Sequence, residues 1–243
     1  MKFGFLSTLD NPLLSEFISS AILNEIKNIY IIIDTLGTNK KDQEIFKLRT
    51  NGKFGNNFQL EECIKKFNDI KFPFYFVKNH NSNEAINLYK KLNLNCLLNT
   101  GTPRKLSFEV IDIIKNGIVN VHPGILPQYR GCSCIEWAII NDDPIGNTAH
   151  FMDINYDTGP IIKTEKYNFS NKFKYSDIRN HVYLKGCNLA AKVLKGIEKK
   201  EINIRNTIKQ NPEKGKYWDP IPYELESKAI SKANEGRYKF QID

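Results

Sequence analysis

Short apolar runs alternate with segments of helical periodicity through the first half of the chain, and this alternation restricts the fold more than any other feature. The run Ile29–Asp34 is almost continuously apolar, as expected for a strand that is covered on both faces. Before it, Leu14, Phe17, Ile18 and Ala21 follow the i, i+3, i+4 spacing of a helix with one buried face. Strands that alternate with helices predict an α/β fold with a mostly parallel sheet.

The same pattern predicts a series of elements along the chain. Parallel strands are expected at residues 2–6, 29–34, 74–77, 95–99 and 118–121, and antiparallel strands at 147–153 and 160–168. Helices are expected from residue 12 to about 22, after an Asp10 or Asn11 cap, from about 83 to 92, from 108 to about 116, and from a Ser176 cap to about 199. Polar segments at 37–41 and 50–57 are expected to be mobile loops on either side of a short helix.

Beyond Glu201 the chain shifts to strand-and-turn character, with Asn-Pro and Asp-Pro pairs at 211–212 and 219–220. We therefore expect a Rossmann-like domain over residues 1–200 and a small C-terminal α+β extension over residues 201–243. The extension is expected to serve in substrate binding or dimerisation.

Composition and charge narrow the class of protein. The longest unbroken apolar stretch, around Ile29–Ile33, is far shorter than the ~20 residues that cross a bilayer. The segment Met1–Leu6 has no small-residue cleavage site, so it is expected to be a strand and not a signal peptide. We expect a cytoplasmic protein. The formal charge of +8 favours acidic partners, among them phosphates, nucleotides, polyglutamylated cofactors and nucleic acid.

The five cysteines do not indicate a disulfide framework, because their number is odd and they are scattered along the chain. Cys132 and Cys134 are separated by one residue, whereas zinc ligands are usually separated by two to four. We expect buried, reduced thiols and no metal site.

The candidate catalytic residues follow the fifth predicted strand. Asn120 and His122 lie two apart near its carboxyl end, so their side chains project from the same face. Open α/β sheets bind their ligands at this end of the strands. Asp157 precedes a Thr-Gly turn after a later strand and is placed to reach the same crevice.

An amide, an imidazole and a carboxylate suit acyl transfer to an amine. The attacking amine must lose a proton, which His122 can accept near neutral pH, and Asp157 can support the imidazole. Negative charge develops on the carbonyl oxygen, and the amide of Asn120 is a suitable donor to it. No serine or cysteine nucleophile is needed. For any one of these residues alone, a purely structural role at the strand end would be the better interpretation.

The segment 120–131 reads Asn-Val-His-Pro-Gly-Ile-Leu-Pro-Gln-Tyr-Arg-Gly, followed by Gly-Asn-Thr-Ala-His at 146–150 and Asp-Thr-Gly-Pro-Ile at 157–161. It resembles the folate-dependent formyltransferase family, which shares Asn-x-His-Pro-Ser-Leu-Leu-Pro-x-Tyr-Arg-Gly, Gly-x-Thr-x-His and Asp-x-Gly-x-Ile. Gly124 stands where the family usually has serine. The match runs from about Asn99 to Tyr167, and the loop after Leu6 departs from the family's glycine-containing pattern.

The resemblance implies a formyl transfer from 10-formyltetrahydrofolate, with Asn120, His122 and Asp157 as the catalytic set. It also implies a pterin pocket that binds largely through backbone groups. The residues expected to line that pocket are Arg104, Lys105, Leu106, Asp153, Ile154 and Tyr156.

Four classes of formyltransferase-like enzyme compete. Methionyl-tRNA formyltransferases carry a larger C-terminal barrel than the 44 residues (243 − 199) that follow Lys199. Glycinamide ribonucleotide formyltransferases usually have a glycine-rich first loop, where this chain has Ser7-Thr8-Leu9-Asp10. Formyltetrahydrofolate hydrolases carry an additional N-terminal domain. Sugar-nucleotide N-formyltransferases, with the core and a short extension, match best.

The expected acceptor is therefore the amino group of a dTDP- or UDP-linked amino-deoxy sugar, a small molecule and not a nucleic acid. Lys78 is a candidate contact for the diphosphate, and Tyr217 or Trp218 for the base, with a solvated lysine and packed aromatics as the open alternatives. Further candidates in the family block are Gly124, Gln128 and Arg130. Family habit suggests a homodimer. From another class, a basic, non-enzymatic nucleotide- or RNA-binding protein remains an alternative, which the intact Asn120, His122 and Asp157 set disfavours.

Overall fold

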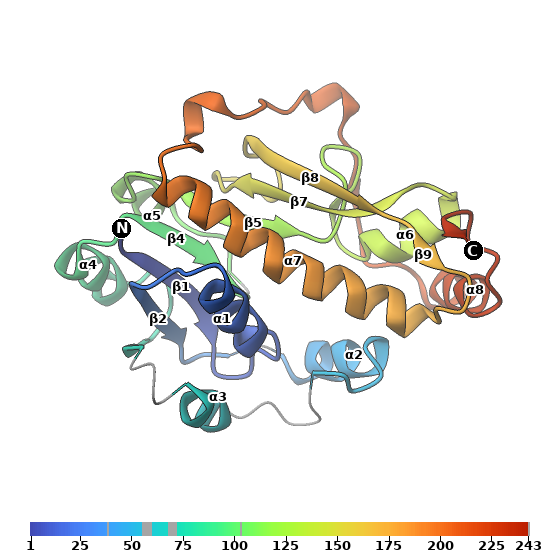
Figure 1. Cartoon of the computed structure of the whole chain (residues 1–243), viewed down its shortest axis with the longest axis horizontal. Helices are drawn as coiled ribbons and strands as arrows, with labels where there is room; N and C mark the ends of the chain where they lie inside the picture. Colours follow the sequence, from blue (N-terminus) through green and yellow to red (C-terminus); the bar gives the residue numbers. More distant parts are fainter. Residues whose placement is uncertain (38, 55–59, 68–71, 103, 243) are drawn as a thin grey trace.

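A seven-stranded sheet forms the centre of the computed structural model, which describes residues 1–37, 39–54, 60–67, 72–102 and 104–242. The strand order is β3-β2-β1-β4-β5-β7-β8 (Figure 1). Its members are β1 (Phe3–Thr8), β2 (Ile29–Asp34), β3 (Phe74–Val77), β4 (Cys96–Asn99), β5 (Ile118–His122), β7 (Ile145–Phe151) and β8 (Ile161–Tyr167). Strands β1 to β5 are parallel, and β7 pairs antiparallel with both β5 and β8. The expected Rossmann-like α/β fold is thereby confirmed.

Helices cover both faces of the sheet. On one face, α1 (Leu14–Leu23) and the long α7 (Tyr175–Glu198) pack against the alternate side chains of the strands, and α7 lies over the β5 and β7 part of the sheet (Figure 1). On the other face lie α4 (Asn83–Leu92) and α5 (Phe108–Ile113). The remaining helices are α2 (Lys40–Arg49), α3 (Leu60–Lys66), α6 (Cys134–Asn141) and α8 (Tyr223–Asn234).

Two of the four helices for which the sequence predicts a capping residue begin directly after that residue. The hydroxyl groups of Ser82 and Ser107 accept hydrogen bonds from the third residue of α4 and α5, as expected. α1 begins at Leu14, two residues later than expected, although Oδ1 of Asn11 accepts a hydrogen bond from the backbone N–H of Leu13. α7 begins at Tyr175, two residues before the start that a Ser176 cap predicts.

The C-terminal part contains a helix that the expected strand-and-turn character missed. α8 buries Ala229 and Ala233 in a second core, which it shares with α6 and the first half of α7. Alanine side chains are small and give only a weak apolar periodicity, whereas the neighbouring prolines indicate turns. The sequence pattern therefore does not reveal this helix. Two short strands complete this part: β10 (Tyr217–Trp218) pairs with β6 (Arg130–Gly131), and β11 (Gln241–Ile242) pairs with β9 (Phe169–Ser170).

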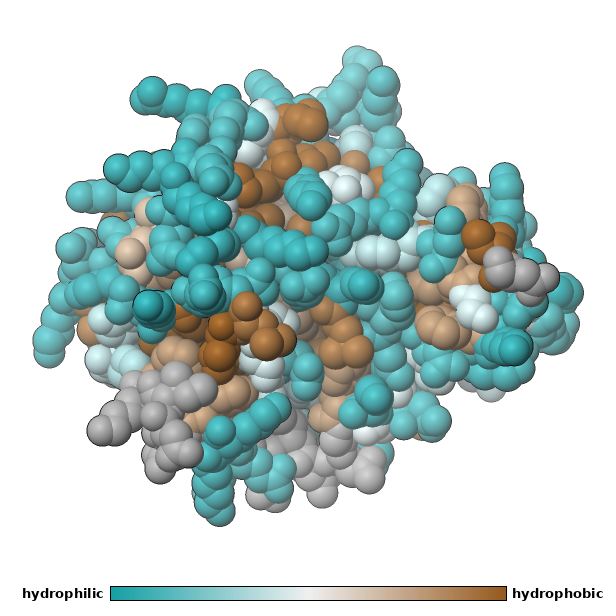
Figure 2. Space-filling model, in the orientation of Figure 1, coloured by the Kyte–Doolittle hydropathy of each residue, from teal (hydrophilic) through white to brown (hydrophobic). Residues whose placement is uncertain are grey.

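The surface is mostly hydrophilic on the face seen in Figure 2, where hydrophobic side chains form separate patches. Within the described ranges, no helix combines the length and the apolar character needed to span a bilayer. Residues 55–57, which are part of the polar segment 50–57, lie outside the described residues. The division of the chain into two domains at residue 200 stays a prediction.

Candidate active site

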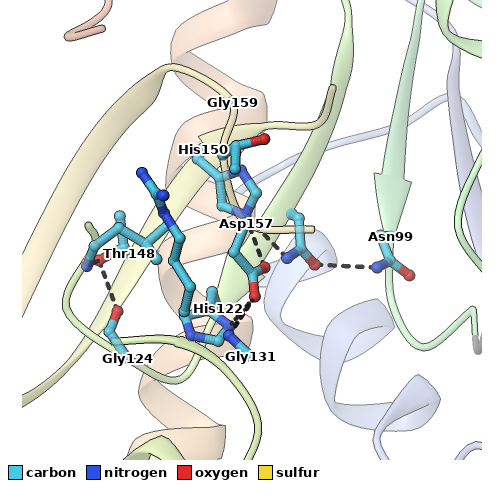
Figure 3. Close-up of polar contacts among 12 residues, drawn as sticks. Asn99, His122, Gly124, Gly131, Thr148, His150, Asp157 and Gly159 are labelled. Carbon is cyan, nitrogen blue, oxygen red and sulfur yellow. Dashed lines mark hydrogen bonds and ion pairs between the residues drawn. The ribbon is translucent and has the colours of Figure 1, made fainter. Parts of the chain in front are cut away.

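The register of two neighbouring strands gathers the site. β5 and β7 are antiparallel, with Asn120 opposite His150 and His122 opposite Thr148. Side chains of directly opposed residues lie on the same face of a sheet, so all four project together. Asp157 comes from the loop between β7 and β8, in a left-handed conformation with φ 56°. Figure 3 shows its carboxylate between the rings of His122 and His150.

His122 is buried with its two ring nitrogens in different surroundings. Nε2 lies 2.8 Å from the carbonyl oxygen of Tyr129, which can only accept, so Nε2 carries a proton. Nδ1 faces Oδ2 of Asp157 at 3.4 Å. Burial lowers the pKa of His122, and the nearby Asp157 carboxylate offsets this in part. The imidazole is therefore neutral near pH 7, with Nδ1 as the nitrogen that can take up a proton.

The Asp157 carboxylate stays ionised despite its burial. Burial by itself would raise its pKa, but His122, His150 and a hydrogen bond from the backbone N–H of Gly131 together hold the pKa well below its usual range. Oδ1 lies 3.6 Å from Nε2 of His150. A fixed negative charge thus stands beside the nitrogen of His122 that accepts a proton.

The Asn120 side chain is held from both ends. Its Oδ1 accepts a hydrogen bond from Nδ2 of Asn99 at 3.1 Å, and its Nδ2 lies 3.1 Å from Nε2 of His150. From the sequence, a buried structural histidine is the better interpretation of His150 and support of the site from the adjoining strand is the alternative, while Asn99 is singled out only as the start of the matching segment. Asn99 ends β4, the neighbour of β5 in the sheet, and this shared carboxyl edge is the signal that could have identified it.

Three of the six expected cofactor residues, Lys105, Ile154 and Tyr156, have exposed side chains at the Asp157 loop, and the other three have side chains engaged elsewhere. Ile154 and Tyr156 are exposed, and Nζ of Lys105 lies 5.9 Å from the ring of Tyr156. The guanidinium of Arg104 instead forms a two-hydrogen-bond ion pair with the buried Asp34. The two remaining side chains are also engaged: Leu106 is buried in the core, and Asp153 accepts hydrogen bonds within its own loop.

The expected substrate residues in the family block mainly support the loop that carries the site. Gly124 packs so closely that an added Cβ would lie 2.7 Å from Nε2 of His122. The guanidinium of Arg130 donates two hydrogen bonds to Oε1 of Gln210, at 2.9 and 3.2 Å. Gln210 in turn donates to the carbonyl oxygens of Asp157 and Gly159, at 3.0 and 2.7 Å. The sequence pattern assigns no role in the site to Gln210.

The aromatic candidates differ in their exposure. Trp218 is stacked on Tyr129, with ring centroids 5.4 Å apart, and Nζ of Lys216 lies 3.4 Å from its ring. Its indole N–H donates to the exposed Gln128's carbonyl oxygen. Tyr217 is 53% exposed, so its ring is the one available to a ligand. Lys78 follows β3, and three strands separate β3 from β5, so Lys78 lies apart from the cluster.

Four of the five cysteines are buried and all are unpaired, but Cys132 is exposed, which corrects the expectation of five buried thiols. Sγ of Cys134 lies 3.4 Å from Nε2 of His122. Within the part of the chain that the structure describes, no three histidine, cysteine, aspartate or glutamate side chains form a group that could hold a metal ion.

A small cavity adjoins the amide of Asn120. It has a volume of about 170 Å³ and is lined on one side by α1 and α7 and on the other by the ends of β4 and β5, with Asn99, Asn120, Asn147 and Tyr183 in its wall. A larger groove of about 720 Å³, between α2, α7 and α8, contains none of the candidate catalytic residues. The smaller cavity is the one that fits the chemistry, because it reaches Asn120.

These features define a class of protein: an α/β fold with a side-chain amide, a neutral imidazole and an ionised carboxylate gathered at the carboxyl edge of its sheet. Residues 18–194 match the formyl transferase family. The chain belongs to this family, and the resemblance found in the segment 120–161 is thereby confirmed.

Proteins of similar sequence include methionyl-tRNA formyltransferases. Methionyl-tRNA formyltransferase of Clostridium tetani is 32% identical over 152 residues, which cover 62% of this chain and 46% of the relative. That of Borrelia turicatae is 33% identical over 124 residues, 51% of this chain and 40% of the relative. The chain thus matches less than half the length of these relatives.

Solved structures of similar fold cover more of the chain. An N-formyltransferase of Helicobacter canadensis, in complex with folinic acid and dTDP-3-aminofucose, has a TM-score of 0.63 at 17% identity and covers 96% of this chain and 81% of its own. A 4-N formyltransferase of Francisella tularensis has a TM-score of 0.61 at 21% identity and covers 96% and 87%. Glycinamide ribonucleotide transformylase 1 of Symbiobacterium toebii has a TM-score of 0.62 at 14% identity and covers 87% and 94%.

Proposed function

We propose that this protein transfers a formyl group from 10-formyltetrahydrofolate to the amino group of a dTDP- or UDP-linked amino-deoxy sugar, in the cytoplasm, during the synthesis of a glycan precursor such as lipopolysaccharide O-antigen. The observation that carries the proposal is the joined set of Asn120, His122 and Asp157 within a formyl transferase. A folate-type donor also fits the rim of the site. Exposed Ile154 and Tyr156 offer apolar and aromatic contacts, and Lys105 offers a cation for a carboxylate.

Each catalytic residue has a defined task in the proposed reaction. The amine nitrogen attacks the formyl carbon, and the negative charge that develops on the formyl oxygen is met by an N–H of Asn120. The ammonium proton passes to Nδ1 of His122, and the imidazolium that forms is stabilised by Asp157 at 3.4 Å. His122 then returns the proton to the folate nitrogen as its bond to the formyl carbon breaks.

The acceptor class is supported by a structural neighbour and by a cavity of the protein. A neighbour whose structure holds a dTDP-linked amino sugar covers 96% of the chain. The cavity beside Asn120 is lined by side-chain amides and a phenol, groups that hydrogen-bond to sugar hydroxyls. Methionyl-tRNA is the second candidate, favoured by sequence relatives that are 32% and 33% identical.

The test is to incubate the protein with 10-formyltetrahydrofolate and each of several amines: dTDP- and UDP-linked amino-deoxy sugars, glycinamide ribonucleotide and methionyl-tRNA. Tetrahydrofolate release and the product mass are measured. A sugar nucleotide heavier by one formyl group, absent with His122→Ala, supports the proposal. Formylation of methionyl-tRNA or glycinamide ribonucleotide alone overturns the acceptor but retains the chemistry. The proposed homodimer is tested separately by the molar mass in light scattering.

A further inference from the structure

Side-chain amides on adjacent strands form a chain of hydrogen bonds that ends in the catalytic site. Asn99, the last residue of β4, accepts hydrogen bonds at Oδ1 from the backbone N–H groups of Gly101 and Thr102, at 3.0 and 2.8 Å. Its Nδ2 donates to Oδ1 of Asn120, and Nδ2 of Asn120 contacts Nε2 of His150. Figure 3 shows the hydrogen bond of Asn99 toward the cluster around Asp157.

The direction of this chain is fixed at both ends. Backbone N–H groups can only donate, so the oxygen of Asn99 must face Gly101 and Thr102, and its NH₂ group must face Asn120. At the other end, Nδ1 of His150 lies 2.9 Å from the carbonyl oxygen of Phe151, which can only accept. His150 therefore donates from Nδ1 and presents the lone pair of Nε2 to the NH₂ group of Asn120.

Both ends thus require the same orientation of the Asn120 amide. Its oxygen faces Asn99, and its NH₂ group faces the site with one N–H engaged by His150 and the second available to a ligand. An asparagine amide can rotate by 180° about its last bond, which would replace the donor with an oxygen and repel a developing negative charge. Asn99 prevents this rotation.

We propose that Asn99 is a positioning residue that holds the amide of Asn120 in the orientation that donates to the formyl oxygen. This inference rests on the proposed formyl transfer. The donor N–H of Asn99 carries the effect, while the acceptor oxygen of Asn99 only anchors the loop at Gly101 and Thr102. Substitutions can separate these two functions.

Asn99→Asp is the discriminating variant, because its carboxylate still accepts from Gly101 and Thr102 but offers no donor to Asn120. We expect kcat to fall toward that of Asn120→Ala, on the order of 10²-fold, with KM for both substrates little changed. The double variant Asn99→Asp/Asn120→Ala should be no slower than Asn120→Ala, because both changes remove the same donor. Thermal unfolding of Asn99→Asp is measured to confirm a folded protein.

With an active enzyme, three kinetic outcomes overturn the inference. If Asn99→Asp has the wild-type kcat, the role of Asn99 is limited to anchoring the loop at Gly101 and Thr102. If only KM for the acceptor rises, Asn99 contacts the acceptor directly, in the cavity whose wall it shares. If the losses of the two single variants multiply in the double variant, the residues act independently. Should the wild type be inactive with every acceptor, the proposed function fails. The side-chain amide NMR signals of Asn120, assigned by their loss in Asn120→Ser, then test the orientation alone, and signals unmoved in Asn99→Asp overturn the inference.

Discussion

Replacement of Asp157 by asparagine removes one negative charge from the site with little change in shape. The oxygen of the new amide can accept the hydrogen bond that the backbone N–H of Gly131 donates to Oδ2 of Asp157 at 3.0 Å. The loop that carries residue 157 also keeps the two hydrogen bonds that Gln210 donates to its backbone. The variant therefore tests the charge of the carboxylate and not the position of the loop.

The expected loss follows from the distance between the two charges. Unit charges 3.4 Å apart attract by about 5 kcal/mol at an effective dielectric constant of about 20. This attraction arises when His122 takes up the proton of the attacking amine, so it lowers the barrier and not the energy of the resting enzyme. At 1.36 kcal/mol per factor of ten, we expect kcat to fall by on the order of 10³-fold.

The assay is kcat against pH for the wild type and Asp157→Asn, with the exposed Asp112→Asn as the matched control. The Asp157 carboxylate raises the pKa of His122, so its removal lowers that pKa and moves the acidic limb of the profile to lower pH. A variant that retains more than a tenth of the wild-type kcat, or whose acidic limb stays in place, would refute the electrostatic role.

Four other variants test the supports of the site and the core. Gln210→Ala leaves two loop carbonyl groups unpaired, and we expect ~1–3 kcal/mol lower stability in urea and a reduced kcat; an unchanged kcat would contradict the tether. Gly124→Ala places a Cβ 2.7 Å from the backbone oxygen of Tyr129, so calorimetry should show a loss of ~1–3 kcal/mol. Glu136→Ala leaves the buried Arg179 without its carboxylate partner, and denaturant unfolding should show a loss of stability of ~3–5 kcal/mol. A loss below ~1 kcal/mol would contradict a stabilising role of this ion pair. Because burial lowers the pKa of His122, the unfolded chain takes up this proton first, and the fold loses stability as pH falls below about 6.5. The melting temperature of His122→Gln should therefore fall less between pH 7 and pH 5 than that of the wild type.

The sequence predicts the sheet well because its strands are buried on both faces. Residues 29–34 and 74–77 coincide with β2 and β3, and the other strands differ from expectation only at their ends. The helices of the C-terminal part were harder to predict. α8 packs through alanines, whose contribution to an apolar period is small, and its partners lie far away along the chain in α6 and α7.

The candidate catalytic residues could be found because they stand at strand ends in one family block. Their partners are harder to find, because each depends on a contact between segments that are separate in the sequence. Asn99 reaches Asn120 from the neighbouring strand, and Gln210 reaches Arg130 from 80 positions away. Such pairs leave no periodic signal. The electrostatic state of His122 likewise follows from burial that only the folded chain creates.

The bond from Gln210 to the Asp157 loop has a consequence for engineering this scaffold. The extension contributes a strand partner to Arg130 and Gly131 and fastens the catalytic aspartate, so the chain after α7 is part of the reaction centre as well as of its periphery. A chimera that exchanges this tail to recruit another amine would also shift the Asp157 carboxylate that faces His122. Swaps should retain the Arg130–Gln210 contact and vary only the surfaces outside it.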